Sequence, residues 1–274
     1  MGTHAKESKM TILKRHDTGA IAHLTMDMPT TLNALSDEML AALQAQIESL
    51  MTDTTVRVVI LSGAGKAFCA GHDIKQMNAA RASADGGKSA FQDLFARCTA
   101  VMTGLQNLPQ VVIAQVHGIA TAAGCQLVAS CDLAVAADDT KFGVNGVNIG
   151  LFCSTPMVAL SRNIPRKHAL EMLTTGDFMT APRAAELGLI NHAVPSPQLE
   201  AETLQLATTI ANKLGAAVRI GKPAFYQQLQ MPLDQAYAFT SEVIVENLLQ
   251  QDTIEGMMAF AEKRQPNWKN DYNF

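Results

Sequence analysis

The sequence predicts an α/β protein with a helical C-terminal region, and three observations support this prediction. Up to about residue 155, short apolar runs typical of strands alternate with segments of helical periodicity. Beyond that point the strand patterns mostly disappear and apolar residues recur at helical spacing. Hydrophobic residues make up 48% of the 274 residues, which is ample material for a buried core. Helices that alternate with buried strands favour crossover connections and a largely parallel sheet.

Local patterns predict the individual elements of the first half. Residues 20–28 (AIAHLTMDM) alternate between apolar and polar, as a half-buried strand does. Ser36 precedes Asp37 and Glu38, and a serine cap followed by acidic residues is typical of a helix start. The remaining predicted elements are buried strands at 56–63, 111–118 and 131–137 and an amphipathic helix at 91–108.

The second half reads as a layer of helices, and the boundaries can be placed approximately. Residues 1–10 are polar and are predicted to be a disordered or tag-like N-terminus. The α/β core is expected over 11–195, and Pro195, Ser196 and Pro197 suggest a hinge into a helical region over 198–274. The Ala-, Ser- and Gly-rich segment 76–90 is expected to be a mobile loop, either a plain surface loop or a lid.

Composition excludes several classes of function. A net charge of −4 offers no basic surface for nucleic acid, and no apolar run approaches the roughly 20 residues of a membrane span. The five cysteines are scattered without CxxC spacing, which argues against disulfides and zinc and predicts no metal site. Reduced thiols of this kind indicate a cytoplasmic location.

Three stretches rich in glycine and alanine could carry chemistry. They are GAGKAFCAGHDIKQM (63–77), GIATAAGCQLVAS (118–130) and KFGVNGVNIGLFCSTP (141–156). In the first two a tight turn leads into a helix, where free backbone N–H groups can bind an oxyanion. Each stretch alone is a weak signal, because a Gly/Ala turn is more often only a tight connection.

Taken together and in order, these stretches identify a resemblance. The chain resembles the crotonase, or enoyl-CoA hydratase/isomerase, superfamily from about residue 10 to 270. The resemblance is closest to its enoyl-CoA hydratase domain-containing group. The residues that carry it are LNALS (32–36), GKAFCAGHDIKQM (65–77), GIATAAGCQLVASCDLAVAADDTKFG (118–143), GVNIGL (146–151), AAELGLINHAVP (184–195) and FAEKR (260–264).

The resemblance implies a fold, a ligand and an assembly. The expected fold is a crotonase-like ββα spiral core with a C-terminal helical region that forms trimers or dimers of trimers. The expected ligand is a coenzyme A thioester, with no other cofactor. In this family two backbone N–H groups hold the thioester oxygen as it becomes an enolate, and by position these belong to His72 and Ala123.

Further ligand contacts are carried over from the same motifs. Phe260 and Lys263 match the segment that reaches coenzyme A, and this contact could cross a subunit boundary. Lys66 could approach the nucleotide phosphates by charge attraction. The remaining expected substrate-binding residues are Ala67, Phe68, Ala70, Asp73, Ile74, Cys153 and Ser154.

The chain departs from the family at its acidic positions. Hydratases of this family use two glutamates on one water, and these positions are Gln126 and Gly146 here. The further carboxylate of diene isomerases is replaced by Ser154. An amide cannot take a proton near neutral pH, so hydration should be weak or absent. On this reasoning, a variant with glutamate at both 126 and 146 should gain hydration.

Several readings stay open from the sequence. The chain could stabilise a thioester enolate as a nominal hydratase, or perform decarboxylation or thioester hydrolysis. It could also be a non-catalytic acyl-CoA-binding protein. Cys153 or Ser154 could act as a nucleophile only with a base beside it, and His72 is the one apparent base nearby. Asp132 is read as a structural residue.

Overall fold

A twisted, mostly parallel sheet forms the centre of the molecule. The computed structural model describes residues 11–268, and the predicted disordered terminus at 1–10 lies outside them. The six strands lie in the order β1-β2-β3-β4-β6-β9, and only the β1–β2 pair is antiparallel. The strands are β1 (Leu13–Thr18), β2 (Ile21–Met26), β3 (Val58–Gly63), β4 (Val111–Val116), β6 (Leu133–Ala137) and β9 (His192–Val194). The predicted strands and the parallel sheet are therefore confirmed.

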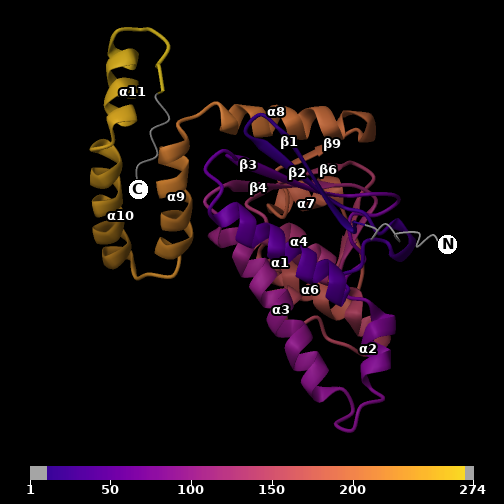
Figure 1. Cartoon of the computed structure of the whole chain (residues 1–274). Coiled ribbons are helices and arrows are strands. Elements are labelled where there is room, and N and C mark those ends of the chain that lie inside the picture. Colours follow the sequence, from indigo (N-terminus) through magenta and orange to yellow (C-terminus); the bar gives the residue numbers. More distant parts are fainter. Residues whose placement is uncertain (1–10, 269–274) are drawn as a thin grey trace, which may run out of the picture.

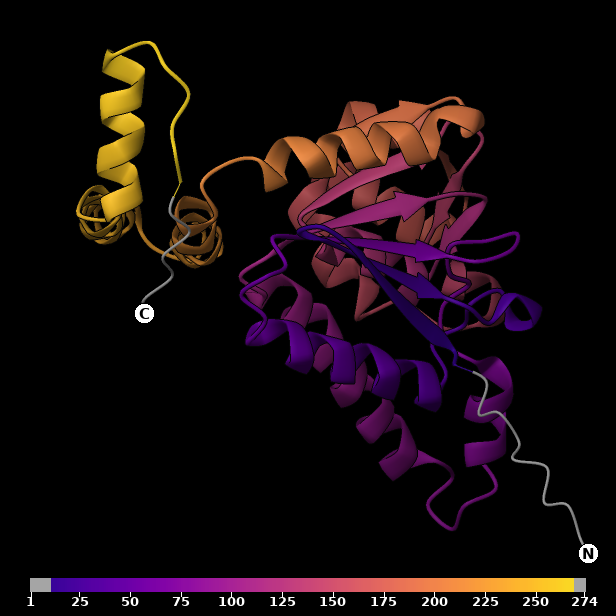
Figure 2. The same cartoon turned by 45° about the horizontal axis from the view of Figure 1, so that its top comes forward.

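Helices cover both faces of this sheet, so its central strands β3 and β4 are largely buried on both sides, while the edge strand β1 is mostly exposed. Helix α8 (Leu199–Ala211) lies across one face, while α1 (Asp37–Met51), α3 (Lys88–Asn107) and α4 (Ala123–Ser130) lie on the other (Figures 1 and 2). Along β3, Val58 and Ile60 pack in the cluster under α8, and Val59 and Leu61 pack in the larger cluster opposite. This is the packing expected of a parallel strand rich in Val and Ile.

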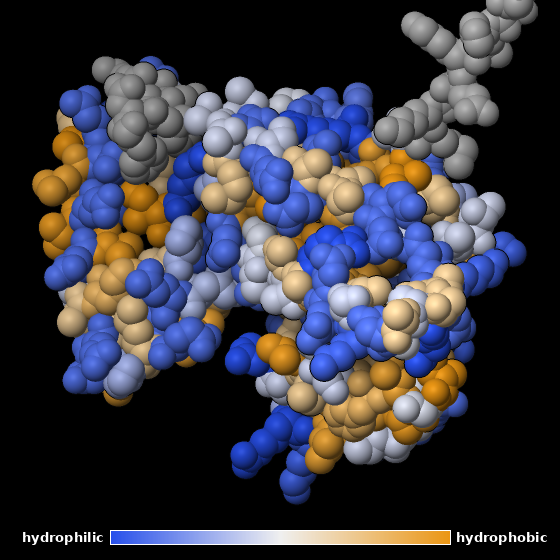
Figure 3. Space-filling view, turned by 60° about the horizontal axis from the view of Figure 1, so that its bottom comes forward, coloured by the Kyte–Doolittle hydropathy of each residue, from blue (hydrophilic) through white to orange (hydrophobic). Residues whose placement is uncertain are grey.

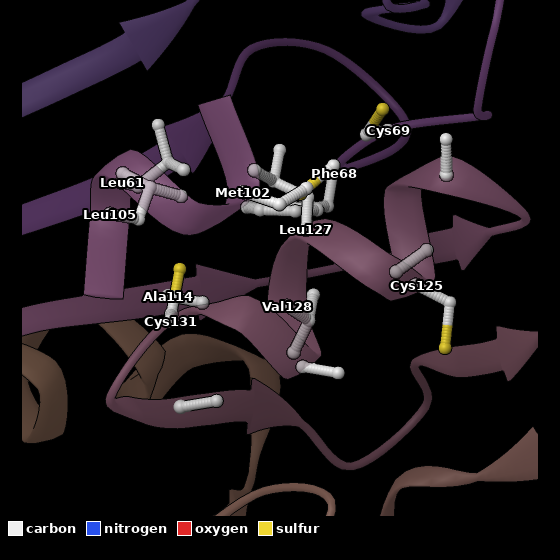
Figure 4. Packing of buried hydrophobic residues seen from close by; sticks show 14 of the residues in the cluster. Leu61, Phe68, Cys69, Met102, Leu105, Ala114, Cys125, Leu127, Val128 and Cys131 are labelled. Atoms are coloured by element: carbon white, nitrogen blue, oxygen red, sulfur yellow. The ribbon is translucent and has the colours of Figure 1, made fainter. Parts of the chain in front are cut away.

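The larger cluster joins the helices to the loop that precedes α2. Phe68 packs there with residues such as Met102 and Leu105 of α3 and Leu127 of α4 (Figure 4). The serine cap is confirmed at α1, where the Ser36 hydroxyl accepts a hydrogen bond from Met39 N at 3.2 Å. All five cysteines are free and buried.

The chain also contains elements that the sequence patterns did not predict. A small second sheet runs in the order β5-β7-β8, with β5 (Ile119–Thr121), β7 (Lys141–Gly143) and β8 (Met179–Thr180). The segment expected to be a loop from 76 to 90 is partly helical, because α2 (Ile74–Ala80) occupies its start and α3 begins at Lys88. Asp73 explains α2, since its carboxylate accepts hydrogen bonds from Lys75 N and Gln76 N.

The last three helices form an arm that projects from the sheet body (Figure 1). They are α9 (Gly215–Gln228), α10 (Leu233–Leu248) and α11 (Gln251–Ala261). Helix α8 precedes the arm and contacts β3, β4 and β6, so it packs with the sheet although it follows the predicted hinge at 195–197. The division of the chain at 195–198 stays a prediction. The other helices of the second half are α5 (Pro156–Asn163), α6 (Arg166–Thr175) and α7 (Ala181–Leu187).

A buried ion pair ties the arm to the core. Lys222 of α9 lies 2.7 Å from Asp132, and its ammonium also donates to the carbonyl oxygens of Leu105 and Gln110. The second carboxylate oxygen of Asp132 accepts from Tyr226 Oη at 2.8 Å. Burial raises the pKa of Asp132 and lowers that of Lys222, and the attraction between the two charges opposes both shifts. Asp132 therefore has the structural surroundings that the sequence predicted.

A Lys222→Met variant is expected to lose about 3–5 kcal/mol of unfolding free energy, because it leaves the Asp132 carboxylate buried without its counter-charge. Urea denaturation followed by circular dichroism measures this loss. Tyr226→Phe removes only one hydrogen bond to the same carboxylate and should cost less, about 1.5–2 kcal/mol. A Lys222→Met protein as stable as the Tyr226→Phe protein would contradict the role given to this pair.

No helix between residues 11 and 268 combines the length and the hydropathy that a bilayer crossing requires. Over the same residues, no group of three or more His, Cys, Asp or Glu side chains is placed to hold a metal ion.

Candidate functional site

Two loops from separate parts of the chain meet at the N-terminus of α4. Cys69 N donates to Ile119 O at 3.2 Å, and Thr121 N donates back to Cys69 O at 3.1 Å. Gly71 has φ +93°, and a Cβ built on it would lie 3.0 Å from Ala122 Cβ. The same Cβ would lie 3.4 Å from the nitrogen of Ala123. The main chain just before His72 therefore lies against the first turn of α4.

The residue that caps α4 has a strained backbone. Ala122 has φ 50° and ψ −119°, a conformation that residues with a side chain seldom adopt and that costs about 1–3 kcal/mol. Its own N–H is fixed to Gly143 O at 2.9 Å. A strained backbone of this kind persists only where the surrounding structure holds it in place. Because Ala123 follows this cap as the first residue of α4, its N–H points out of the end of the helix.

The two expected oxyanion donors lie on these loops with their N–H groups free of main-chain partners. Ala123 is the first residue of α4, so its N–H has no acceptor within the helix. Across residues 11–268, neither His72 N nor Ala123 N donates to another backbone oxygen. The positive end of the α4 dipole adds to the attraction for an anion. This arrangement can bind an oxygen that gains negative charge.

Gly124 permits the close approach of the two loops. A Cβ on Gly124 would overlap the carbonyl oxygen of Cys69. No other residue fits here unless the loop before His72 moves away from α4. Ala122, Ala123 and Gly124 form a run of small residues, which predicts a backbone open to close approach, and the Cys69 carbonyl occupies the space beside Gly124.

The imidazole of His72 points away from the free N–H groups and towards α3. Its ring meets the Phe95 ring edge-on, with centroids 5.4 Å apart, and Nδ1 lies 3.5 Å from Leu35 O. Nε2 is buried and has no hydrogen-bond partner in the described part of the chain. Burial lowers the pKa of this imidazole, so it is neutral at pH 7. The His72 side chain therefore packs against α3, while its backbone N–H has no main-chain partner among the described residues.

A cavity of about 110 Å³ lies beside this loop, between the start of α1, helix α2 and helix α3. Leu35, which pairs with His72 in a β-bridge, contributes to its wall together with Met77 and Phe91. Arg97 also lines the cavity, and its guanidinium is held between Asp37 and Asp93. The cavity is therefore partly apolar and has a charged end.

The two positions expected to hold glutamates lie on segments that adjoin the strained cap. Gln126 is on the second turn of α4, and Gly146 follows strand β7, which pairs with β5 just before Ala122. A hydrogen bond of 2.7 Å from Thr121 Oγ1 to Asn145 Oδ1 joins the two segments. The structure thus joins the two segments that contain these positions.

Gln126 is buried, and its side-chain oxygen lacks a partner. The residue is 6% exposed, and Oε1 accepts no hydrogen bond from any described residue. An unsatisfied buried acceptor costs about 1–3 kcal/mol. The buried Gln126 amide therefore lowers the stability of the folded protein.

Gly146 has no room for a side chain. A Cβ on Gly146 would lie 2.8 Å from Cys153 Sγ and would overlap the carbonyl oxygen of Leu151. The chain folds back here, since Leu151 N donates to Gly146 O at 2.9 Å. The expectation that glutamate at both 126 and 146 raises hydration needs correction. The Leu151 carbonyl and the Cys153 thiol occupy the space that a side chain at position 146 would need.

Neither Cys153 nor Ser154 has the partner that a nucleophile needs. Cys153 is 6% exposed, and burial raises the pKa of its thiol, which keeps it protonated. Ser154 is exposed, and its hydroxyl donates only to Phe152 O at 3.3 Å. No hydrogen bond between described residues joins either side chain to a histidine.

The other expected contact residues fall into two groups. Ala67 and Phe68 are fully buried in the core, so only their backbone is available to a ligand. Lys66 and Ile74 are exposed, and Ala70 and Asp73 are half-buried beside the same loop.

Phe260 and Lys263 lie on or just after α11, in the projecting arm (Figure 1). Phe260 is 86% exposed and borders an open groove that Trp268 also lines. Figure 3 shows apolar residues gathered along this arm. A single chain therefore does not bring these two residues to the loops at Ala123, and their predicted role requires a partner subunit.

Comparisons with known proteins decide the family. The model of the enoyl-CoA hydratase/isomerase family matches residues 16–271. The chain belongs to the enoyl-CoA hydratase/isomerase family. This family member is 44% identical over 266 residues to the mitochondrial enoyl-CoA hydratase domain-containing protein 3 of Xenopus laevis, covering 97% of this chain and 88% of the relative.

Solved structures agree with this assignment. An enoyl-CoA hydratase of Mycobacterium smegmatis is 49% identical with a TM-score of 0.91, over 94% of this chain and 99% of that one. Human enoyl-CoA hydratase domain-containing protein 3 is 42% identical with a TM-score of 0.89, over 94% of this chain and 100% of that one. The predicted crotonase fold of this family member, with its C-terminal helices, is confirmed.

The expected cytoplasmic location is wrong on this comparison. Curated relatives from Xenopus laevis, Mus musculus and Homo sapiens are all named as mitochondrial proteins. The prediction rested on unpaired cysteines, and free thiols report a reducing environment without distinguishing one compartment from another.

Proposed function

We propose that this chain binds acyl-CoA thioesters and holds the thioester oxygen between the N–H groups of His72 and Ala123. The observation that carries the proposal is that the loop before His72 packs against the first turn of α4, where the N–H groups of His72 and Ala123 have no main-chain partner among the described residues. Membership of the enoyl-CoA hydratase/isomerase family supports a coenzyme A thioester as the ligand.

The bound carbonyl is polarised towards an enolate. As negative charge moves onto the thioester oxygen, each N–H donor strengthens its hydrogen bond, and one such donor is typically worth about 3–4 kcal/mol of barrier.

Hydration of an enoyl thioester is expected to be weak or absent at this site. It requires one group to take a proton from water and another to give a proton to the α-carbon, each worth roughly 10²–10⁴ in rate. Gln126 can do neither, and Gly146 has no side chain.

Decarboxylation of a thioester is the second candidate, and the absence of these carboxylates favours it. Loss of CO₂ generates the enolate directly, so no base is needed and the two N–H groups supply the stabilisation. Thioester hydrolysis lacks comparable support, because it needs an activated water or nucleophile.

We also propose that copies of this chain assemble into an oligomer. The arm of α9, α10 and α11 exposes large apolar side chains such as Leu233, Tyr237 and Leu249. We expect these helices to join copies of the chain into trimers or dimers of trimers. Phe260 and Lys263 would then contact the coenzyme A of a neighbouring subunit.

Calorimetric titration with butyryl-CoA, crotonyl-CoA and free coenzyme A tests the proposed binding. Both thioesters should bind more tightly than coenzyme A alone, since only they have an oxygen for the two N–H groups. Light scattering on the same protein should give a trimer or hexamer. Failure of both thioesters to bind would overturn the proposal, and a strict monomer would overturn its assembly.

A further inference from the structure

Two polar side chains adjoin the strained cap of α4 and have no part in the proposed binding. Thr121 ends β5 directly before Ala122, and Asn145 begins the short 3₁₀-helix that follows β7. Thr121 Oγ1 lies 2.7 Å from Asn145 Oδ1, and both residues are half-buried. The hydrogen bond forms with either orientation of the Asn145 amide, because a hydroxyl donates to an amide oxygen and accepts from an amide nitrogen.

This side-chain bond continues the connection between two strands beyond the end of their pairing. Strands β5 and β7 run parallel, and the last pair in their register is Thr121 with Gly143. The next link is the bond from Ala122 N to Gly143 O at 2.9 Å. Between the described segments 122–124 and 144–146 there is no backbone hydrogen bond. The bond between Thr121 and Asn145 therefore secures the end of β5 where the backbone ladder stops.

The conformation of Ala122 decides where the N–H of Ala123 points. Ala122 has φ 50° and ψ −119°, and the planar peptide unit that carries the Ala123 N–H turns with this ψ. At a negative φ, which a residue with a side chain prefers, a ψ of −119° is not allowed. If the end of β5 separated from residues 143–145, relaxation of Ala122 would therefore turn this N–H away from its present direction.

We propose that Thr121 and Asn145 are positioning residues that hold the Ala123 N–H in the direction that the thioester oxygen requires. The inference rests on the proposed function, because it takes Ala123 N as a donor to that oxygen. Without the side-chain bond, only a fraction of the molecules keeps the strained cap, and the apparent affinity falls by that fraction. The loss of one hydrogen bond corresponds to a fall of about three- to tenfold.

Thr121→Val removes the hydroxyl and keeps the branched shape of the side chain. Calorimetry on the intact protein should give this variant an affinity for butyryl-CoA about three- to tenfold below that of the parent. Its affinity for free coenzyme A should not change, because coenzyme A has no thioester oxygen for Ala123 N. Thr121→Ser retains a hydroxyl and should recover most of the lost affinity.

Asn145→Ala removes the other partner of the same bond. It should lower the affinity for butyryl-CoA by a factor similar to that of Thr121→Val. The variant with both substitutions should bind no more weakly than either single variant, since two substitutions that remove one interaction are not additive.

Infrared difference spectroscopy reports on the N–H donors directly. Butyryl-CoA with a ¹³C-labelled thioester carbonyl should show a lowered C=O stretching frequency when bound, because the donors polarise the bond. This lowering should be smaller in Thr121→Val. Thr25→Val is the matched control, since it removes a comparable bond between Thr25 Oγ1 and Ser62 Oγ, 3.2 Å long, that joins β2 and β3. The control should keep the affinity and the spectrum of the parent.

The outcomes separate this inference from the proposed function. A Thr121→Val protein with the parent's affinity and spectrum would overturn the inference and leave thioester binding intact. Equal losses for butyryl-CoA and free coenzyme A, or additive losses from the two substitutions, would also overturn it. If Thr121→Val does not fold, the affinity and spectrum of Asn145→Ala decide in the same way. No binding of any thioester by the parent would refute the proposed function and this inference together.

Discussion

A Gly146→Glu variant is expected to lose about 3 kcal/mol or more of unfolding free energy and to gain no hydration of crotonyl-CoA. The new Cβ would overlap Leu151 O and press on Cys153 Sγ. Overpacking alone costs about 1–3 kcal/mol, and a backbone carbonyl cannot move aside as a side chain can. Urea denaturation and a hydration assay measure the two effects.

Ile149→Glu is the control for this substitution. It places the same carboxylate on the same short helix, at a side chain that is 67% exposed, and should change stability little. A Gly146→Glu protein that is as stable as this control and hydrates crotonyl-CoA would show that the segment can open to admit a catalytic glutamate.

A Gly124→Ala variant is expected to weaken acyl-CoA binding at least about tenfold, because the methyl group must push α4 away from Cys69 and so separate the two N–H donors. It should also lose about 1–3 kcal/mol of unfolding free energy from overpacking. Calorimetry with butyryl-CoA and urea denaturation report the two losses separately.

Gly221→Ala provides the matched comparison. Gly221 lies in helix α9, and a Cβ on it would meet nothing within 4 Å. This variant should bind butyryl-CoA as the parent does and should be slightly more stable, because alanine is the better helix former. If Gly124→Ala and Gly221→Ala behave alike, then the close approach of the two loops does not shape the site.

Local patterns predicted the fold well where one residue or one periodicity decides the structure. Ser36 caps α1 as expected, and strands β3 and β4 lie where short apolar runs predicted them. The helix α2 was partly missed, because the Ala- and Gly-rich composition after residue 77 favours a loop, and the Asp73 cap is seen only in the structure. Strands β5 and β7 have three residues each and are held by pairing with each other and, for β7, with β8, which the periodicity of a single segment does not reveal.

The sequence motifs predict which residues form the candidate site, but they predict the packing and hydrogen bonding around those residues only partly. The motifs located His72, Ala123, Gln126 and Gly146, and the structure brings their segments together. The crowding at Gly146 depends on a fold-back of the chain at Leu151. Gly150, with φ +77°, indicates a turn there, but it does not indicate which atoms the turn brings against Gly146. The orphaned oxygen of Gln126 is likewise a property of its surroundings and not of its sequence.

The central claim is that the site holds an acyl-CoA thioester by backbone N–H groups and lacks the acid–base machinery for hydration. The most direct test measures hydration of crotonyl-CoA at a concentration that calorimetry shows to saturate the protein. An ordinary hydratase of the same family serves as the reference. The account predicts tight binding with turnover lower by at least about 10². Turnover comparable to that of the reference enzyme would contradict it.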